Sequence, residues 1–239
     1  VEPSSTIIIS KFLLFRFCAF SDLRHLPTYF SAFSTGTTTD IRKLFCINFN
    51  FLLCIHTLYY SKMKRKIIIT GGCGFIGSNL AEYLIKKNFK IIILDDLSVG
   101  SINNIKHFKK KIKFIRSNVN KINNIKSIKG DIFAIIHLAA KAEILIKKKE
   151  ENKYYDNNIN SVMQILNFSS RKKIKRIIFA SSASVYGDTK NLKVNENFDL
   201  KPAHFYAYTK YIGEKMITSY CKINSIKYTI MRFFNIYGP

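Results

Sequence analysis

A tyrosine and a lysine four residues apart, Tyr206 and Lys210, are the residues whose types and spacing could move a proton. Residues four apart on a helix share one face, so the ammonium of Lys210 can lie near the phenol of Tyr206. A phenol titrates at about pH 10, and an adjacent positive charge favours the phenolate. Tyr206 is therefore a candidate general base, and the hydroxyl of Ser182 could hydrogen-bond the same substrate oxygen.

The spacing of Tyr206 and Lys210 is a weak signal by itself, because a chain rich in lysine and tyrosine produces it by chance. Tyr208 lies in the same stretch, but its fourth following residue is Ile212, so it has no such partner. The interpretation of Tyr206 depends on the segments around it.

A glycine-rich string, TGGCGFIGSN at residues 70–79, joins an expected strand to an expected helix. Its first glycine permits a tight turn, its second lets backbone N–H groups approach a pyrophosphate, and its third lets the helix pack closely on the sheet. The helix N-terminus adds partial positive charge. Glycine turns of this kind are also common for structural reasons alone. The predicted phosphate-binding residues are Gly71, Gly74, Phe75, Ile76 and Gly77.

Two aspartates, Asp95 and Asp96, end the second expected strand, about 20 residues beyond the glycine string. Asp95 is predicted to hold the adenosine ribose hydroxyls, with Asp96 beside it. A carboxylate there repels a 2′-phosphate, so the sequence favours NAD over NADP. The alternative is that both aspartates simply open a turn, as Asp often does.

The fourth expected strand ends in small and apolar residues that could let the backbone approach the other face of the cofactor. They are Leu138, Ala139 and Ala140, and tight packing is a compatible role for them. His137 lies among apolar neighbours. We expect it to be a hydrogen-bonded core histidine without a catalytic role.

The elements that must position these residues alternate along the chain. The predicted strands are 66–70, 90–94, 112–115, 132–138, 176–181 and 227–233, and the predicted helices are 76–87, 154–170 and 205–222. Strands rich in isoleucine on both faces, alternating with helices, indicate a buried parallel sheet covered on two sides. The predicted fold class is α/β, a doubly wound parallel sheet of the Rossmann type.

The chain divides near Met63 into two parts. Residues 63–239 are predicted to be an NAD-binding domain. Residues 1–62 have no assignable domain and are expected to be upstream translated sequence. The apolar stretch 47–60 is too short for a bilayer span of roughly 20 residues, and charges inside 7–20 argue against a secretory signal. We therefore expect no membrane partner.

The net charge of +24 arises from 39 Lys and Arg against 15 Asp and Glu, and it raises the question of a nucleic-acid partner. The lysines are scattered among isoleucine and asparagine without forming a stripe, so we expect no nucleic-acid function. The five cysteines form no C-x-x-C pair and have no histidine at metal-ligand spacing. No metal site is predicted, and a reduced, cytoplasmic protein is expected.

Together these strings resemble the extended short-chain dehydrogenase/reductase family, within it most closely the UDP-glucose 4-epimerase-like enzymes. The resemblance extends over residues 64–239. Seven strings occur in that family's order: TGGCGFIGSN, LDDLSVG, HLAAKAE, YYDNNIN, SSASVYG, YAYTK and RFFNIYG. It implies that Asn158 and Phe234 lie near the nicotinamide, that Lys210 reaches its ribose, and that Asn235 contacts a substrate diphosphate.

The chain departs from the family's pattern in three places. Where the family usually has Gly-Asp after the third strand, this chain has Ser117-Asn118-Val119, so adenine contacts are expected to rest on the Asn118 amide. The segment 143–149, EILIKKK, lacks the Ser or Arg found there in many relatives, which leaves the substrate preference open. The chain also stops at Pro239, before the smaller substrate domain, which we expect to be missing. Little turnover is expected from this chain alone. Relatives pair through helices that here begin near Tyr154 and Phe205, so a homodimer is expected at full length.

The residues after Ser182 bear on the reaction. Dehydratases of the family typically have acidic residues there, but this chain has Ala183 and Ser184. The resemblance therefore favours epimerisation of a nucleotide sugar at C4 over 4,6-dehydration or decarboxylation. Tyr206 is expected to remove the 4-hydroxyl proton while hydride passes from C4 to NAD and returns to the other face of a transient 4-keto sugar. The implied substrate contacts are Ser182, Tyr206 and Asn235.

A catalytically silent NAD-binding interaction protein is the alternative from another class, since a fold does not guarantee chemistry. The presence of Ser182, Tyr206 and Lys210 together speaks against it.

Overall fold

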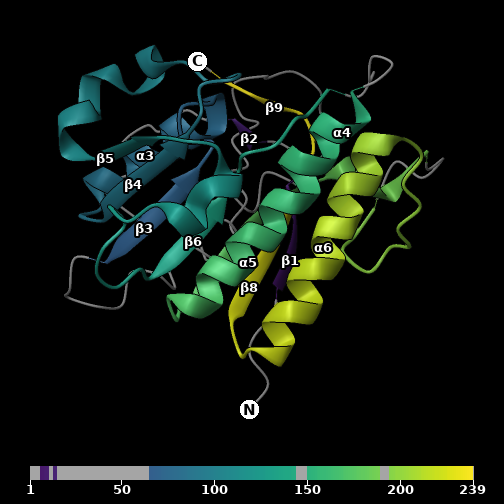
Figure 1. The fold of residues 1–239 in the computed structure, drawn as a ribbon. Helices are drawn as coiled ribbons and strands as arrows, with labels where there is room; N and C mark the ends of the chain where they lie inside the picture. The colour runs from purple at the N-terminus through teal and green to yellow at the C-terminus, as the bar shows by residue number, and fades with distance from the viewer. Residues whose placement is uncertain (1–5, 11–12, 15–64, 144–149, 189–193, 239) are drawn as a thin grey trace, which may run out of the picture.

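The computed structural model describes residues 6–10, 13–14, 65–143, 150–188 and 194–238. Its centre is a parallel sheet of seven strands in the order β1-β8-β7-β6-β3-β4-β5 (Figure 1). The strands are β1 (Thr6–Ser10), β3 (Lys66–Thr70), β4 (Lys90–Asp95), β5 (Lys113–Arg116), β6 (Ala134–His137), β7 (Arg176–Ser182) and β8 (Lys227–Phe233). A separate short pair joins β2 (Leu13–Leu14) to β9 (Ile236–Tyr237).

The helices lie on both faces of this sheet, with α3 on one face and α5 and α6 on the other (Figure 1). The α-helices are α3 (Phe75–Lys86), α4 (Glu151–Tyr154), α5 (Ser161–Arg171) and α6 (Phe205–Ile223). Three short 3-10 helices, η4 (Ile102–Lys111), η5 (Val119–Asn124) and η7 (Ala183–Tyr186), and one π-helix, η6 (Tyr155–Asn160), complete the described helical segments.

Alternation along the strands builds the two layers of core. In β3, Ile67 and Ile69 pack on the α3 side, whereas Ile68 between them packs on the side of α5. In β7, Ile177 and Phe179 face α5 and α6, while Ile178 between them points the other way. Successive side chains of a strand point to opposite faces, so a run of apolar residues serves both layers at once. The doubly wound α/β fold predicted from the sequence is confirmed.

The predicted strands and helices begin and end within two residues of the observed ones, with one exception. The single helix expected at 154–170 begins earlier, at Glu151, and contains the π-helix η6 between α4 and α5. The buried side chain of Asn158 lies within η6 and bonds to two other segments.

No strand was predicted at residues 6–10, which form β1 in the structure. Its three consecutive isoleucines have high strand propensity, and it pairs with β8 as the outermost strand. Apart from residues 6–10 and 13–14, the region 1–62 lies outside the described residues. Its interpretation as upstream sequence stays a prediction.

Close packing brings α6 against β7. A Cβ added at Gly213 of α6 would lie 2.7 Å from Cζ of Phe179 in β7, so this helix can approach the strand because glycine stands there.

Within the described ranges no helix is both long and apolar enough to cross a membrane.

Replacing Ile93 tests the two-layer core. Ile93 is fully buried in β4, and Ile93→Ala is expected to lower the free energy of unfolding by about 2–5 kcal/mol because it leaves a cavity. Ile223→Ala, at a residue that is 80% exposed at the end of α6, is the matched control and should change it by less than about 0.5 kcal/mol. Urea unfolding measures the free energy of unfolding of both variants. Equal losses in the two variants would contradict the placement of Ile93 in the core.

Candidate active site

The sheet reverses its strand order between β3 and β6, and ligands of doubly wound folds bind at the carboxyl ends of strands at such a point. Here Thr70 ends β3 and His137 ends β6, with Thr70 Oγ1 and His137 Nδ1 2.7 Å apart. The other ring nitrogen of His137 lies 3.3 Å from the Ser161 hydroxyl. His137 is the hydrogen-bonded core histidine that the sequence predicted. Burial, together with the positive charge of Lys210, lowers its pKa to about 3.

The glycine loop follows β3 directly. Gly71 has φ +68°, and a Cβ there would lie 2.8 Å from the backbone nitrogen of Ala139. A Cβ at Gly77 would lie 2.3 Å from the carbonyl oxygen of Gly71. At Gly74, by contrast, the carbonyl oxygen of Gly71 at 3.3 Å is the one atom of the described residues within 4 Å of an added Cβ. Gly71 and Gly77 are required by the fold, whereas Gly74 leaves open space beside the loop.

The start of α3 fits an anionic ligand. Gly74 occupies the N-cap position and provides no side chain to cap the helix, and the first turn contains no acidic residue. The first N–H groups of a helix carry partial positive charge and need acceptors. A diphosphate next to Gly74 would supply them, so this loop fits the phosphates of NAD.

Asp95 ties the glycine loop to β4. One of its carboxylate oxygens accepts the N–H of Cys73 at 2.9 Å, and the other accepts the N–H of Leu97 at 2.8 Å. Asp96 accepts the N–H of Ser98 at 2.9 Å in the same way. Each aspartate thus bonds the N–H two residues further on, which is the turn-forming role considered as the alternative. Asp95 has the additional role of bracing the loop.

The side chain of Asn118 is used within the protein. Its Nδ2 donates to Asp96 at 2.8 Å and its Oδ1 accepts from the N–H of Asn120 at 2.9 Å. Burial raises the pKa of Asp96, but bonds from Ser98 and Asn118 outweigh burial and leave it below the usual value. Val119 is buried at the start of η5. Their predicted adenine contacts stay a prediction.

Tyr206, Lys210 and Ser182 meet at the carboxyl end of β7. Tyr206 and Lys210 are both buried on α6, and the Lys210 ammonium donates to the carbonyl of Ala180 at 2.8 Å. The ammonium lies 6.0 Å from the centroid of the Tyr206 ring. Ser182 ends β7 and is hydrogen-bonded to Tyr206. The structure places the three residues together, and their catalytic role stays a prediction.

The expected lowering of the Tyr206 pKa by Lys210 is absent from the structure. Burial raises the pKa of Tyr206, and the hydrogen bond with Ser182 offsets this only in part. The Lys210 ammonium is bonded to the Ala180 carbonyl and lies over the faces of the Phe179 and Tyr206 rings. Burial also lowers the pKa of Lys210 itself to about 8, against the opposing effect of Glu214.

Asn158 joins the end of β6 to α6. Its side chain accepts from the N–H of Lys141 at 2.8 Å, and donates to the Lys141 carbonyl and to the Thr209 hydroxyl, each at 2.9 Å. The amide therefore positions the segment after β6, which carries Leu138, Ala139 and Ala140, against the helix of Tyr206. Its expected place near the nicotinamide is a separate prediction.

The two site residues predicted after β8 differ in exposure. Phe234 is half-buried and packs against the cluster of Val185, Tyr186 and Val194, whereas Asn235 is exposed. An exposed amide is available to a ligand, but nothing in the described residues holds Asn235 in place.

Sequence reasoning missed a buried ion pair next to the site, Glu214 on α6 and Arg232 on β8. Two signals could have found it. Glu214 continues the spacing of Tyr206 and Lys210 by four more residues, and Arg232 interrupts an apolar strand. Charged residues are rarely fully buried unless they are paired.

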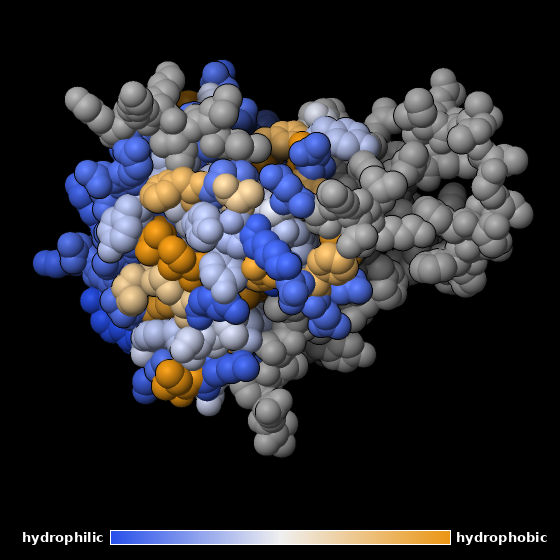
Figure 2. Space-filling model, turned by 90° about the vertical axis from the view of Figure 1, so that its right-hand side faces the viewer, coloured by the Kyte–Doolittle hydropathy of each residue, from blue (hydrophilic) through white to orange (hydrophobic). Residues whose placement is uncertain are grey.

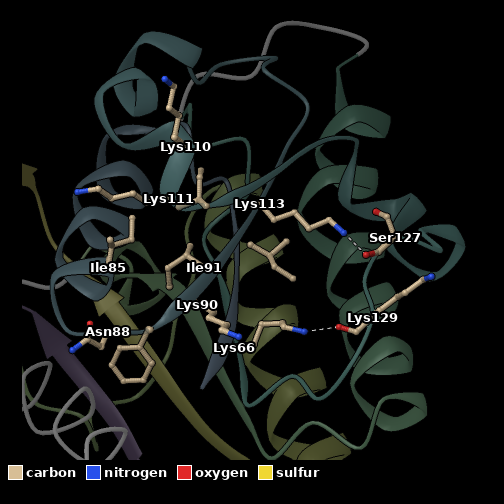
Figure 3. A pocket seen from close by; sticks show the side chains of 13 residues that line it. Lys66, Ile85, Asn88, Lys90, Ile91, Lys110, Lys111, Lys113, Ser127 and Lys129 are labelled. Carbon is tan, nitrogen blue, oxygen red and sulfur yellow. Dashed lines mark hydrogen bonds between the residues drawn. The ribbon is translucent and has the colours of Figure 1, made fainter. Parts of the chain in front are cut away.

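A pocket of about 650 Å³ lies at the opposite edge of the sheet, where β3, β4 and β5 begin (Figure 3). Its wall contains six lysines, but their ammonium groups point in different directions. Lys66 and Lys113 bond to the carbonyls of Lys129 and Ser127. Because these charges do not converge, we place the candidate site at the carboxyl edge.

Among the described residues, no group of three His, Cys, Asp or Glu could hold a metal ion.

Comparison with known sequences gives a consistent family. The sequence profile of the NAD dependent epimerase/dehydratase family matches residues 67–239. The chain is 33% identical over 175 residues to the UDP-glucose 4-epimerase of Lactobacillus helveticus, covering 72% of this chain and 52% of the relative. It is 37% identical over 193 residues to the dTDP-D-glucose 4,6-dehydratase of Dictyostelium discoideum, covering 73% and 44%. The chain thus spans about half the length of these relatives.

Solved structures show the same similarity. UDP-N-acetylglucosamine 4-epimerase from Methanobrevibacter ruminantium M1, in complex with UDP-N-acetylmuramic acid, has a TM-score of 0.68 at 31% identity, covering 74% of this chain and 57% of that one. UDP-glucose 4-epimerase from Brucella ovis, in complex with NAD, has a TM-score of 0.65 at 26% identity, covering 72% and 52%.

Acid should destabilise the protein through His137. Its folded pKa of about 3 lies below the unfolded value of about 6.5, so between these values the unfolded state binds a proton that the folded state excludes. Stability is therefore lost as the pH falls below about 6.5, by up to about 1.4 kcal/mol per pH unit. Urea unfolding between pH 7 and 4.5 should show a shallower loss in His137→Gln. Identical slopes in the wild-type protein and in His137→Gln would refute the prediction.

Proposed function

We propose, because this chain belongs to the NAD dependent epimerase/dehydratase family, that the whole protein is an NAD-dependent nucleotide-sugar epimerase acting at C4. The observation that carries this proposal is the meeting of Ser182, Tyr206 and Lys210 at the same edge of the sheet as the glycine loop, without a carboxylate at residues 183 and 184. The L. helveticus relative is a UDP-glucose 4-epimerase, which supports the same reaction.

The residues proposed to hold NAD follow from the local geometry. The open side of Gly74 and the uncapped start of α3, with Phe75 and Ile76, would take the diphosphate. Asp95 would accept the adenosine ribose hydroxyls with the lone pairs that its two backbone bonds leave free. NAD, when bound, supplies the acceptor and donor of hydride.

The chain's own residues would handle the proton. Ser182 Oγ accepts from both the N–H and the hydroxyl of Ser184, at 3.2 and 2.9 Å, so its own hydrogen is free to donate. This hydrogen can be directed at the oxygen shared by Tyr206 and the sugar. Burial raises the pKa of Tyr206 and so keeps the proton on the phenol until positive charge comes closer. The phenolate would then accept the 4-hydroxyl proton, and the phenol so formed would return a proton when hydride comes back to C4. Epimerisation needs both directions.

Dehydration is the second candidate, favoured by the 37% identity to the D. discoideum dehydratase. Eliminating water requires an added acid and base, and Ala183 and Ser184 provide neither.

The protein expressed from its complete gene should convert a UDP-sugar to its 4-epimer. Release of a 4-keto-6-deoxy product would favour the dehydratase, and NAD binding without any turnover would favour the silent interaction protein.

We further propose a homodimer for the whole protein, through the outer faces of α5 and α6. Met163 and Ile212 on these helices are large apolar residues that are 41% and 39% exposed. Figure 2 shows apolar side chains distributed among polar ones on the face of the molecule that carries α6. Sedimentation of the whole protein would test this association.

Tyr206→Phe should lower turnover sharply, with a much smaller effect on NAD binding. The substitution removes only the hydroxyl, and loss of a general acid or base costs roughly 10²–10⁴-fold in kcat. Tyr208→Phe is the matched control, because Tyr208 lies on the same helix, is half exposed and has no lysine four residues on. Epimer formation by chromatography and NAD binding by calorimetry measure the two effects. Equal activity of the two variants would remove Tyr206 from the mechanism.

Gly74→Ala should weaken NAD binding roughly tenfold or more, about 1.4 kcal/mol, with little change in stability. The new methyl group meets only one described atom, at 3.3 Å, and fills the space proposed for the diphosphate. Gly77→Ala should instead lower stability, because its methyl group would lie 2.3 Å from a backbone oxygen. Calorimetric NAD titration and thermal unfolding separate the two variants. Normal NAD affinity in Gly74→Ala would place the diphosphate elsewhere.

A further inference from the structure

The ion pair of Glu214 and Arg232 is almost completely withdrawn from water, with 3% and 2% of each residue exposed. Arg232 Nε donates to Oε1 of Glu214 at 3.0 Å, and Nη2 donates to Oε2 at 2.8 Å. Two parallel bonds of this kind fix the orientation of both side chains. Desolvating two charges is costly, and apolar residues of similar volume often stabilise a core as well. The pair therefore calls for an explanation beyond stability.

Other elements complete the bonding of the pair. The hydroxyl of Ser181 on β7 donates to Oε1 of Glu214 at 2.5 Å. Arg232 Nη1 donates to the Tyr186 hydroxyl at 2.8 Å and to the Glu196 carbonyl at 3.0 Å. One buried network thus joins α6, β7, η7 and β8.

This network is attached to both sides of the contact between Ser182 and Tyr206. Glu214 lies eight residues after Tyr206 and four after Lys210, so all three occupy one face of α6. Ser181 directly precedes Ser182, and Tyr186 ends the η7 turn that Ser182 caps. A shift of Glu214 would therefore move the helix of Tyr206 relative to the strand end of Ser182.

We propose that Glu214 and Arg232 are positioning residues, which hold Ser182 against Tyr206 and place a negative charge one helical turn from the ammonium of Lys210. The proposal rests on the proposed function, since it assigns these residues to the same site. Neither residue contacts the reacting atoms, and both act through Ser181, Tyr186 and the α6 backbone.

The surroundings of Lys210 define what the Glu214 charge does. The Lys210 ammonium faces Tyr206 and Glu214 on its own helix and His137 on β6, and it bonds to the Ala180 carbonyl on β7. Arg232 on β8 is positive but is bonded to Glu214. Burial lowers the pKa of Lys210 to about 8, and Glu214 opposes this effect. Without the Glu214 charge, Lys210 should lose its proton at a lower pH.

Glu214→Gln in the protein expressed from its complete gene tests the proposal. We expect kcat to fall by roughly 100-fold, as for a small misplacement of reacting groups, with little change in KM, and the alkaline limb of the pH profile to move to lower pH. Glu82→Gln, at a partly exposed carboxylate on α3 paired with Lys86, is the matched control and should keep wild-type kinetics. Wild-type kcat and an unmoved pH profile in Glu214→Gln would overturn the proposal.

A measurement independent of turnover separates this proposal from the proposed function. The Lys210 ammonium can be titrated by ¹³C NMR of labelled lysine, assigned by its loss in Lys210→Met. If the protein epimerises nothing, the proposed function fails, yet a lower Lys210 titration midpoint in Glu214→Gln still supports the electrostatic role of Glu214. An unchanged midpoint overturns that role.

A double variant covers the case in which Glu214→Gln does not fold. Glu214→Leu with Arg232→Met removes both charges together and should fold, because no buried charge is left unpaired. We expect reduced kcat and a lowered Lys210 midpoint in this folded protein. A folded double variant with wild-type kcat would show that the ion pair has only a structural role.

Discussion

Every strand of the sheet runs in the same direction, so all carboxyl ends meet at one edge, and both faces are covered by helices. A sheet buried on both faces offers little room for polar side chains along its length. Thr70, Asp95, His137 and Ser182 accordingly stand at the last residue of their strands. The covering of the sheet thus concentrates the chemistry of the chain at one edge.

Burial at that edge gives the site its electrostatic character. Tyr206, Lys210, Glu214 and Arg232 are each at most 8% exposed. Water does not screen these groups, so each depends on a specific partner. Ser182 interacts with Tyr206, Lys210 lies over the Tyr206 ring, and Glu214 acts on Lys210 and is paired with Arg232. The same desolvation that keeps the proton on the Tyr206 phenol makes a nearby positive charge more effective on it. Proton transfer by Tyr206 would then respond strongly to what binds beside it.

The strand pattern and the glycine loop were readable from the sequence because they depend on local rules. β-branched runs predict strands, and the loop needs glycine wherever a Cβ would strike backbone, as at Gly71 and Gly77. The π-helix around Asn158, the pairing of Glu214 with Arg232 and the raised pKa of Tyr206 were not predicted. Each depends on contacts between residues far apart in sequence and on the depth of burial. Spacing alone indicated that Lys210 would be near Tyr206, but not that its ammonium would bond to a β7 carbonyl.

The glycine loop shows how one short string can serve folding and binding at different residues. Gly71 and Gly77 are constrained from inside, by Ala139 and by the loop's own backbone, whereas Gly74 is constrained hardly at all by the described residues. Asp95 then fixes the loop through the N–H of Cys73, between the constrained glycines. A loop held at both ends and braced in its middle keeps its shape without a ligand. The N–H groups at the start of α3 are therefore already oriented, which reduces the entropy lost when an anion binds there.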